Sequence, residues 1–326
     1  MTEPTQESGT PTSANWQQDV LNKLIFSSLN EQRRARRWNI FFKSLFMVYL
    51  LLLFVLMLLP PMGGDGERFS VGNHTALIEI KGVIAQDAKA SADHIITALR
   101  AAFKNNKSAG IILRINSPGG SPVQAGYIYD EIKRLRAEHQ DKKVYAVITD
   151  ICASGGYYIA AASDEIYADK ASLVGSIGVV MNGFGFVDTL KKLGIERRLY
   201  TAGEHKGFLD PFSPQRKEET AHIKQLLTDI HNQFIKVVKD GRGARLKDDP
   251  KLFSGLIWTG EESVKLGLID GLSSSSSVAR DIIKAEKIVD YTPHEDLLER
   301  LTQRLGTSVA SSLLQQAGTA SNPVTE

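Results

Sequence analysis

The sequence predicts an α/β protein with a mostly parallel sheet, preceded by one transmembrane helix. Short apolar runs typical of buried strands alternate with longer helical stretches over residues 75–290. That alternation indicates right-handed βαβ units, which build parallel sheets. A continuous apolar stretch at 38–60 comes before them, and about 20 such residues suffice to span a bilayer as a helix. We therefore expect a membrane anchor followed by an α/β domain.

The composition excludes several classes of protein. The chain has 326 residues, with 39 basic and 37 acidic side chains and a net charge of +2, so nothing suggests that it binds nucleic acid. Its length allows one large domain or two ordinary ones. The sequence contains one cysteine, Cys152. Neither an intrachain disulfide nor a multi-cysteine metal site can therefore form.

The apolar stretch at 38–60 is interpreted as an uncleaved anchor. It carries one charge, Lys43, near its start, and Pro60 and Pro61 end it. A cleaved signal peptide would have its charges within the first few residues, whereas here the mostly polar segment 1–37 comes first. After the anchor we expect a flexible tether at 61–74, the domain at 75–290 and a partly helical or disordered tail at 291–326.

The charges that flank this stretch predict its orientation. Its N-terminal flank is far more basic than its C-terminal flank, where Asp65 and Glu67 precede Arg68. Because positive charges stay on the cytoplasmic side, we expect a cytoplasmic N-terminus and a domain outside the membrane. We interpret the basic cluster as a topology signal that also attracts lipid headgroups. The cluster consists of Arg33, Arg34, Arg36 and Arg37.

Within the domain, strands and helices alternate in order along the chain. The strand-like runs lie at 75–84, 110–116, 143–149 and 165–168, with a further apolar run at 177–181. The helical stretches between them lie at 88–104, 122–139 and 154–162. This order of strand, helix and strand is the pattern from which the parallel sheet is predicted.

One long helix at 214–240 dominates the C-terminal part of the domain. Its apolar positions recur at helical spacing, so we expect one face to pack on the core or on a neighbouring subunit. Glycines at 241 and 243 are typical of a helix end. A serine-rich loop at 273–277, a helix at 278–287 and an amphipathic stretch at 297–314 follow. The apolar positions are Ile223, Leu226, Leu227, Ile230, Phe234 and Val237.

Two glycine-containing turns directly follow predicted strands, and the first is NSPGGS at 116–121. Ligands bind at the C-terminal ends of parallel strands, and a helix that starts there points free N–H groups toward them. Because Gly119 and Gly120 leave such donors unobstructed, this turn suits an oxyanion hole. A tight turn without a catalytic role is the alternative.

The second turn is DICASGGYY at 150–158. Ser154 follows a strand and precedes two glycines, so we expect its hydroxyl at the start of a helix beside the N–H of Gly155. That arrangement predicts a nucleophile with its own oxyanion donor. An ordinary helix N-cap is the alternative for Ser154. We interpret Cys152 as a small buried residue rather than a competing nucleophile.

A serine nucleophile needs a base, and two candidates lie side by side in the segment TAGEHKGFLDP at 201–211. His205 is one, and the other histidines have no recognisable triad context. Lys206 is the other, because a lysine acts as a base when burial lowers its pKa, and Ser–Lys dyads are a variant of the serine triad. Spacing alone does not choose between them. A solvated loop lysine is the alternative for Lys206.

Several catalytic motifs are absent from the sequence. There is no GxSxG, because position 152 is cysteine, and no SxxK, HExxH or GxxxxGK[ST]. The sequence therefore excludes an ordinary α/β-hydrolase, a penicillin-binding type of enzyme, a zincin and a P-loop nucleotidase.

Four segments follow one another after the N-terminal anchor: NSPGGS at 116–121, ASGGYYIA at 153–160, SLVGSIGVV at 172–180 and HKGFLDP at 205–211. Together they resemble the short form of bacterial signal peptide peptidase A, and the resemblance covers about residues 75–290. It implies a membrane-anchored serine protease with a Ser–Lys dyad and a Clp-protease or crotonase type of fold. It also implies assembly into a ring-like homo-oligomer.

Carried over residue by residue, the resemblance implies roles for five positions. The nucleophile falls on Ser154 and the base on Lys206, in preference to the neighbouring histidine. The serine that orients the lysine falls on Ser176. The oxyanion donors fall on the backbone N–H groups of Gly120 and Gly155. The loop at 207–212 is more apolar than the family pattern, which leaves the details of the substrate pocket open.

The implied reaction is acyl transfer without a metal or cofactor. The implied substrates are apolar peptides, especially remnant signal peptides, which would add as an extended strand beside the site. With the charge pattern, the resemblance places the chain in the bacterial inner membrane with its protease domain in the periplasm.

Two other functions stay open. A crotonase-like acyl-CoA enzyme would have the same fold, and it predicts catalytic acids in the helices and a cytosolic location. A non-catalytic membrane scaffold would use the turn at 154–158 only to start a helix.

Overall fold

The computed structural model describes residues 33–34, 36–54 and 72–293. The chain divides into two units between Ser70 and Val71. In the first unit, Arg36–Phe54 forms a helix with exposed side chains that is long and apolar enough to cross a membrane. The predicted anchor overlaps this helix, and its last residues lie outside the described ones. The segment 1–32, the tether up to residue 71 and the tail from residue 294 also lie outside them.

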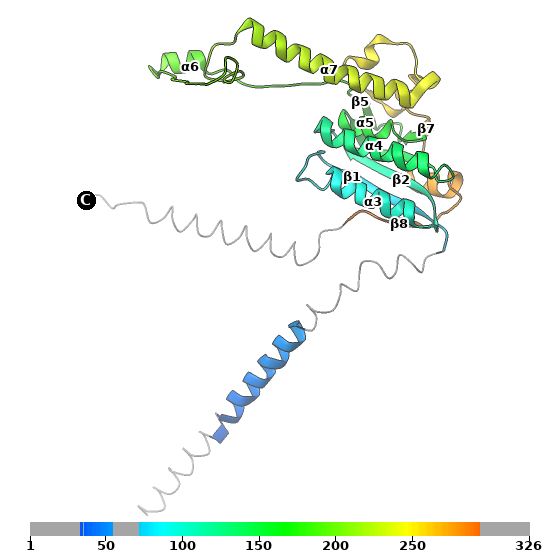
Figure 1. The fold of residues 1–326 in the computed structure, drawn as a ribbon. Coiled ribbons are helices and arrows are strands. Elements are labelled where there is room, and N and C mark those ends of the chain that lie inside the picture. Colours follow the sequence, from blue (N-terminus) through cyan, green and yellow to red (C-terminus); the bar gives the residue numbers. More distant parts are fainter. Residues whose placement is uncertain (1–32, 35, 55–71, 294–326) are drawn as a thin grey trace, which may run out of the picture. The chain divides into compact units, whose positions relative to one another are not determined.

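The second unit is built around one sheet. Its strands are β1 (His74–Lys81), β2 (Ser108–Ser117), β3 (Val144–Ala153), β4 (Glu165–Ala168), β5 (Leu173–Gly175), β6 (Ile257–Thr259), β7 (Gly271–Leu272) and β8 (Ile288–Asp290). They follow the order β6-β5-β3-β2-β1-β8, while β4 pairs with β3 and β7 (Figure 1). Every pair of these strands is parallel except β5 with β6. The predicted α/β class with a mostly parallel sheet is confirmed.

Helices cover both faces of the sheet. On one face lie α3 (Ala92–Lys104), α4 (Pro122–Glu138) and α5 (Gly155–Ala160); on the other lie the single turn α9 (Ser275–Ser277) and the π-helical η3 (Val278–Ile282). Successive strand residues point to opposite faces. Ile78 and Ile80 of β1 therefore belong to the large core with α3, α4 and α5, whereas Leu77 packs in a smaller core with Val278.

Local signals fix the helix ends near the strands. Ser121 caps α4, because its hydroxyl accepts from the N–H of Gln124, and Pro122 occupies the first helical turn. The buried Lys142 donates from Nζ to three carbonyl oxygens at the end of α3. It thereby satisfies groups that a helix end leaves without partners.

Between β5 and β6 the chain leaves the sheet and returns, and we call residues 176–233 the arm. The arm contains α6 (Val187–Lys192) and most of α7 (Lys217–Arg242), which corresponds to the predicted long helix. Figure 1 shows α6 and the start of α7 far from the sheet, whereas the other end of α7 lies against α5. The fully buried residues of α7 are Phe234, Val238 and Arg242. The chain returns to β6 through η1 (Gly243–Arg245) and η2 (Pro250–Phe253), and α8 (Gly260–Lys265) follows β6.

The apolar run at 177–181 forms no strand. The β5 ladder ends at Gly175, because Ser176 turns the chain with a φ of 52° and donates its N–H to the carbonyl of Leu256. An extended ladder cannot continue through a residue in the left-handed region. Ile177 stays buried in the large core, and the side chains of Val180 and Met181 beyond it are exposed on the arm.

The C-terminal elements also differ from the prediction. The serine-rich segment at 273–277 ends in a helical turn, because the hydroxyl of Ser274 accepts from the N–H of Ser277. The predicted helix at 278–287 ends at Ile282, and Lys284 has a φ of 62° that stops it. A serine that caps a helix and a serine in a loop look alike in sequence.

Candidate active site

Ser154 stands at a sharp turn between the end of β3 and the start of α5. Its backbone has a φ of 52° and a ψ of −122°, a conformation that costs a non-glycine residue about 1–3 kcal/mol. Its N–H donates to the carbonyl of Gly175 at 2.9 Å, which holds the turn in place. The hydroxyl makes no capping hydrogen bond to α5. The interpretation of Ser154 as an ordinary N-cap is therefore wrong, and strain of this kind concentrates at functional sites.

The two glycine turns touch each other directly beside Ser154. A Cβ on Gly119 would lie 2.7 Å from the Cβ of Ser154 and 2.8 Å from the backbone N of Gly155, and a Cβ on Gly155 would lie 3.4 Å from the N of Gly120. The N–H groups of Gly120 and Gly155 have no acceptor among the residues that the structure describes. Two free N–H donors beside a serine hydroxyl are the arrangement that an oxyanion hole requires.

Gly119→Ala is expected to abolish most of the activity of this site. Gly119 has a φ of +100°, and a methyl group there would collide with Ser154 and the N–H of Gly155. Losing one oxyanion donor lowers kcat by about 10²–10³-fold, and we expect a loss of that order. The measurement is hydrolysis of a fluorogenic peptide by the full-length chain in detergent.

Gly126→Ala is the matched control for that substitution. Gly126 lies in α4 with nothing within 4 Å of its would-be Cβ, and alanine suits a helix interior better than glycine. It should keep wild-type activity. A Gly119→Ala protein as active as this control would contradict the proposed oxyanion geometry.

Ser176 lies in the same cavity as Ser154. The cavity has a volume of about 660 Å³ and is lined by both serines and both glycines of the oxyanion hole. Like Ser154, Ser176 has a φ of 52°, and its N–H donates to Leu256 at 2.7 Å. Two strained serines at one cavity are consistent with the predicted neighbourhood of nucleophile and orienting serine.

The two candidate bases lie elsewhere in the chain. Lys206 and His205 are exposed in the part of the arm between α6 and α7, and neither lines the cavity of Ser154. His205 Nδ1 is 3.8 Å from the carboxylate of Glu219 in the first turn of α7, whereas Gln233 of the same helix lines the cavity. At the helical rise, the residues from Glu219 to Gln233 span about 21 Å.

That distance is far longer than a lysine side chain. Within one chain, the structure therefore brings together four of the five predicted site residues and leaves Lys206 apart. It does not choose between Lys206 and His205, because the two residues are adjacent. The base stays a prediction.

The cavity wall includes residues whose role was not predicted from the sequence. Tyr158 of α5 and Phe234 of α7 line it, with ring centroids 5.2 Å apart, and Ile230 lies one turn before Phe234. The sequence indicates that Phe234 and Ile230 face the core or a neighbour, but helical spacing alone carries no information about the cavity. The wall that they form is apolar.

Cys152 does not compete with Ser154. It is buried and unpaired, and burial raises the pKa of its thiol, which disfavours the reactive thiolate. The interpretation of Cys152 as a small buried residue is confirmed. Among the described residues, no group of three or more His, Cys, Asp and Glu could hold a metal ion.

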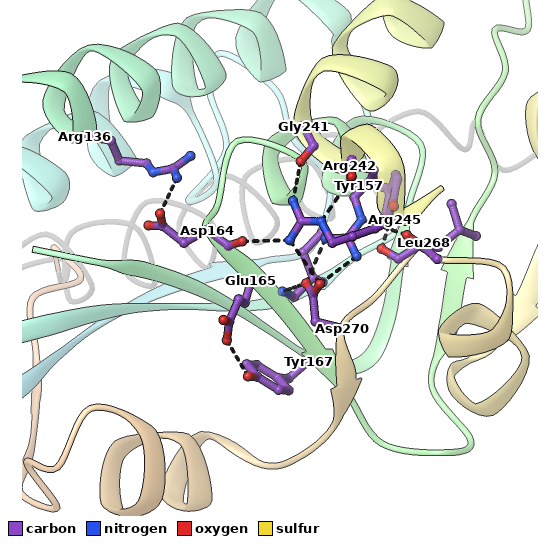
Figure 2. A network of polar contacts seen from close by, with 12 residues as sticks. Arg136, Tyr157, Asp164, Glu165, Tyr167, Gly241, Arg242, Arg245, Leu268 and Asp270 are labelled. Atoms are coloured by element: carbon purple, nitrogen blue, oxygen red, sulfur yellow. Dashed lines mark hydrogen bonds and ion pairs between the residues drawn. The ribbon is translucent and has the colours of Figure 1, made fainter. Parts of the chain in front are cut away.

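A buried ion pair fastens the end of α7 to the body (Figure 2). Arg242, with 1% of its side chain exposed, donates from two nitrogens to Asp270 at 2.8 and 3.0 Å. Its third donor goes to the carbonyl of Gly267 at 2.8 Å. Asp270 also accepts from the N–H of Ile166 in β4 and from Arg245. The carboxylate of Asp270 therefore joins α7, η1 and β4.

The same network reaches the helix of the nucleophile. Tyr157, fully buried in α5, donates its hydroxyl to the carbonyl of Leu268 at 2.7 Å (Figure 2). Leu268 lies two residues before Asp270. The start of α5 and the end of α7 therefore both bond to the segment between α8 and β7. This segment holds the Ser154 turn and the end of α7 in fixed positions.

Comparison with known proteins identifies the family. The profile of peptidase family S49 matches residues 136–289, and the profile of Clp protease matches residues 73–171. Together these matches cover the sheet, the Ser154 turn and the arm.

The relatives carry two kinds of name. Over 217 residues the chain is 48% identical to a protein named Na(+)/H(+) antiporter NhaA from Brucella melitensis, a stretch that covers 65% of the chain and 29% of that relative. Over 245 residues it is 30% identical to Putative protease slr0021 from Synechocystis, covering 72% of the chain and 85% of the relative. Over 223 residues it is 29% identical to Putative signal peptide peptidase SppA from Enterococcus faecium, covering 66% and 64%.

The chain thus spans less than a third of the antiporter relative but most of the Synechocystis protease. The likeness to the Synechocystis protease extends over 72% of the chain, and the profile of family S49 covers the Ser154 turn and the arm. The chain belongs to peptidase family S49.

Proposed function

We propose that this protein is a membrane-anchored serine peptidase that hydrolyses apolar peptides, including remnant signal peptides. The observation that carries this proposal is the strained Ser154 beside two free glycine N–H groups in one cavity. A scaffold has no need for a strained serine at an open cavity. The family and the protease names of two relatives support the reaction class.

The chemistry is acyl transfer. Lys206 in its neutral form takes the proton of Ser154, and the hydroxyl oxygen attacks a peptide carbonyl. The carbonyl oxygen becomes an oxyanion that accepts from the N–H groups of Gly120 and Gly155. Lys206 then gives the proton to the leaving amine as the C–N bond breaks. Lys206 next takes a proton from a water molecule whose oxygen attacks the acyl carbonyl; the ester C–O bond to Ser154 breaks, the serine oxygen regains the proton from Lys206, and the second product leaves as a carboxylic acid.

The separation of Lys206 from Ser154 supports a dyad shared between two copies of the chain. The exposed apolar side chains of the arm support such an assembly, because Val180, Phe184 and Tyr200 each expose more than four fifths of their surface. In the proposed assembly a second copy covers them and places its own Lys206 at the cavity. Burial favours the neutral form of a lysine, and the neutral form is the base. A head-to-tail contact of this kind builds a ring when the rotation between successive copies closes.

The cavity supports apolar peptides as substrates. Tyr158, Ile230 and Phe234 give it an apolar wall. The backbone of Gly178–Val180 lines it too and, within the described residues, belongs to no strand. An extended peptide could pair with that backbone while its side chains enter the apolar wall.

The helix Arg36–Phe54 supports the anchor. With the arginines before it, the proposed orientation places the N-terminus in the cytoplasm and the peptidase body on the periplasmic side of the inner membrane. Peptides left in the membrane would then lie near the body.

Labelling with a fluorophosphonate probe tests the nucleophile. The wild-type chain, full-length in detergent, should react with the probe and cleave a peptide rich in leucine and alanine. Ser154→Ala should do neither, because the bond-forming oxygen is gone. If the wild type neither reacts with the probe nor cleaves the peptide, the result supports a non-catalytic scaffold and contradicts the proposed peptidase.

Ser163→Ala is the control for that experiment. Its hydroxyl is buried without a hydrogen-bond partner among the described residues, so its removal leaves no group unsatisfied. It should label and cleave as the wild type does. Labelling that persists in Ser154→Ala would assign the reactive group to another residue.

A further inference from the structure

His231 lies in α7 at the point where the arm leaves the body. Its Nε2 is 3.2 Å from the carbonyl oxygen of Ile177, the residue after Ser176. A carbonyl oxygen only accepts, so Nε2 carries the proton and donates. This hydrogen bond joins α7 to the backbone that follows Ser176, directly beside the cavity that Ser154 and Ser176 line.

The backbone that follows Ser176 makes few hydrogen bonds to the rest of the chain. Ser176 donates its N–H to Leu256, and the next backbone hydrogen bond along this segment, among the described residues, runs from Phe186 to Pro211 at 2.7 Å. Between these two points the segment is held by the buried side chain of Ile177 and by the hydrogen bond from His231 to the Ile177 carbonyl. Residues in strained conformations persist only where their surroundings fix them, and Ser176 has a φ of 52°.

His231 is itself on a well-fixed part of α7. Phe234, one turn further along, is buried and packs its ring against Tyr158 of α5. The helix is thereby held against the element that begins at the Ser154 turn. A bond from this turn of α7 can transmit that rigidity to Ser176 and to the cavity wall at Gly178–Val180.

We propose that His231 is a positioning residue for hydrolysis at Ser154. It acts through the Ile177 carbonyl, keeps Ser176 in its strained conformation and holds the wall at Gly178–Val180 against the substrate. It touches neither the substrate nor the nucleophile. This inference rests on the proposed peptidase function.

Three variants of the full-length chain in detergent test it. His231→Ala removes the donor and should lower kcat roughly tenfold, the factor that corresponds to about 1.4 kcal/mol and to one hydrogen bond, with KM nearly unchanged. His231→Gln carries an amide N–H at the same distance along the side chain and should restore most of kcat. His222→Ala removes an exposed histidine from the same helix and should match the wild type.

Hydrogen exchange gives a readout that does not depend on hydrolysis. Backbone amides of residues 176–181 should exchange faster in His231→Ala than in the wild type, and His231→Gln should reverse the change. Equal exchange of residues 176–181 in the wild type, His231→Ala and His231→Gln would overturn the proposal. So would a loss of kcat in His231→Ala that His231→Gln does not rescue, because that result indicates general destabilisation. If the wild type shows no peptidase activity, the proposed function fails, and the exchange result still decides whether His231 holds this segment.

Discussion

Ser154→Ala and Lys206→Ala, each inactive alone, are expected to recover about a quarter of wild-type hydrolysis when equal amounts are mixed and reassembled. In a head-to-tail ring, a complete site needs the serine of one copy and the lysine of the next, and random mixing satisfies this at about one contact in four. His205, which adjoins Lys206, contacts Glu219 of α7, and about 21 Å of that helix separates Glu219 from Gln233 at the cavity. This separation is the reason to expect a shared dyad.

Each variant alone should lose several orders of magnitude in kcat. Residues that act as one catalytic unit are not additive, so removing either partner of a dyad removes nearly the whole effect. The measurement is the hydrolysis rate of the full-length variants in detergent, separately and after exchange of subunits. Exchange itself is followed by capture of an untagged variant on a tagged one.

Two results would contradict the shared dyad. If the variants exchange subunits and the mixture stays inactive, the serine and its base belong to one chain. If Lys206→Ala is active alone, the lysine is not the base, and His205→Ala becomes the decisive variant, because His205 is the adjacent candidate and lies in the same loop of the arm.

The centre of the sheet was predictable, whereas β5, β6, β7 and β8 were not, because strands of two or three residues are too short to show a pattern in sequence. β1, β2 and β3 lie on largely apolar runs, and their bounds differ from the predicted ones by at most four residues. The site glycines were predictable for the same reason, since they follow those strands directly. The sequence places Ser154 at the end of a predicted strand, and in a parallel sheet this position by itself indicates a ligand site.

The rest of the site depends on contacts between distant segments. Arg242 and Asp270 are 28 residues apart, and His231 and Ile177 are 54 residues apart. No periodicity or motif links such pairs, because Arg242, Asp270 and His231 each look like an ordinary polar residue and the bond to Ile177 is made by its backbone carbonyl. The separation of Lys206 from Ser154 could not be predicted either, since it follows from the length and direction of α7.

Asp270→Asn is expected to destabilise the body by about 3–5 kcal/mol, the range for breaking one partner of a buried ion pair. Arg242 would keep its charge with 1% of its side chain exposed and without its carboxylate. The loss is large because Asp270 also accepts from Arg245 and from the N–H of Ile166. Urea unfolding of the full-length chain, followed by circular dichroism at fixed protein concentration, measures it.

Asp240→Asn is the matched control. It makes the same chemical change in α7, at an ion pair with Lys236 whose side chains are 52% and 77% exposed. Exposed pairs contribute little, so its unfolding midpoint should stay near that of the wild type. Equal midpoints for Asp240→Asn and Asp270→Asn would show that the buried network does not hold α7 to the body.

The pH dependence provides an independent check on the same carboxylate. Burial by itself raises the pKa of Asp270, but the hydrogen bonds and charge of Arg242, with further help from Ile166 and Arg245, outweigh it and hold the pKa below its ordinary value. A carboxylate with a lowered pKa stabilises the folded state above its unfolded pKa of about 3.9, and the contribution disappears as the pH falls through the folded value. The stability difference between wild type and Asp270→Asn should therefore be constant near neutral pH and shrink below about pH 4. A difference that persists unchanged at lower pH would mean that the lost contacts, and not the charge of Asp270, carry the effect.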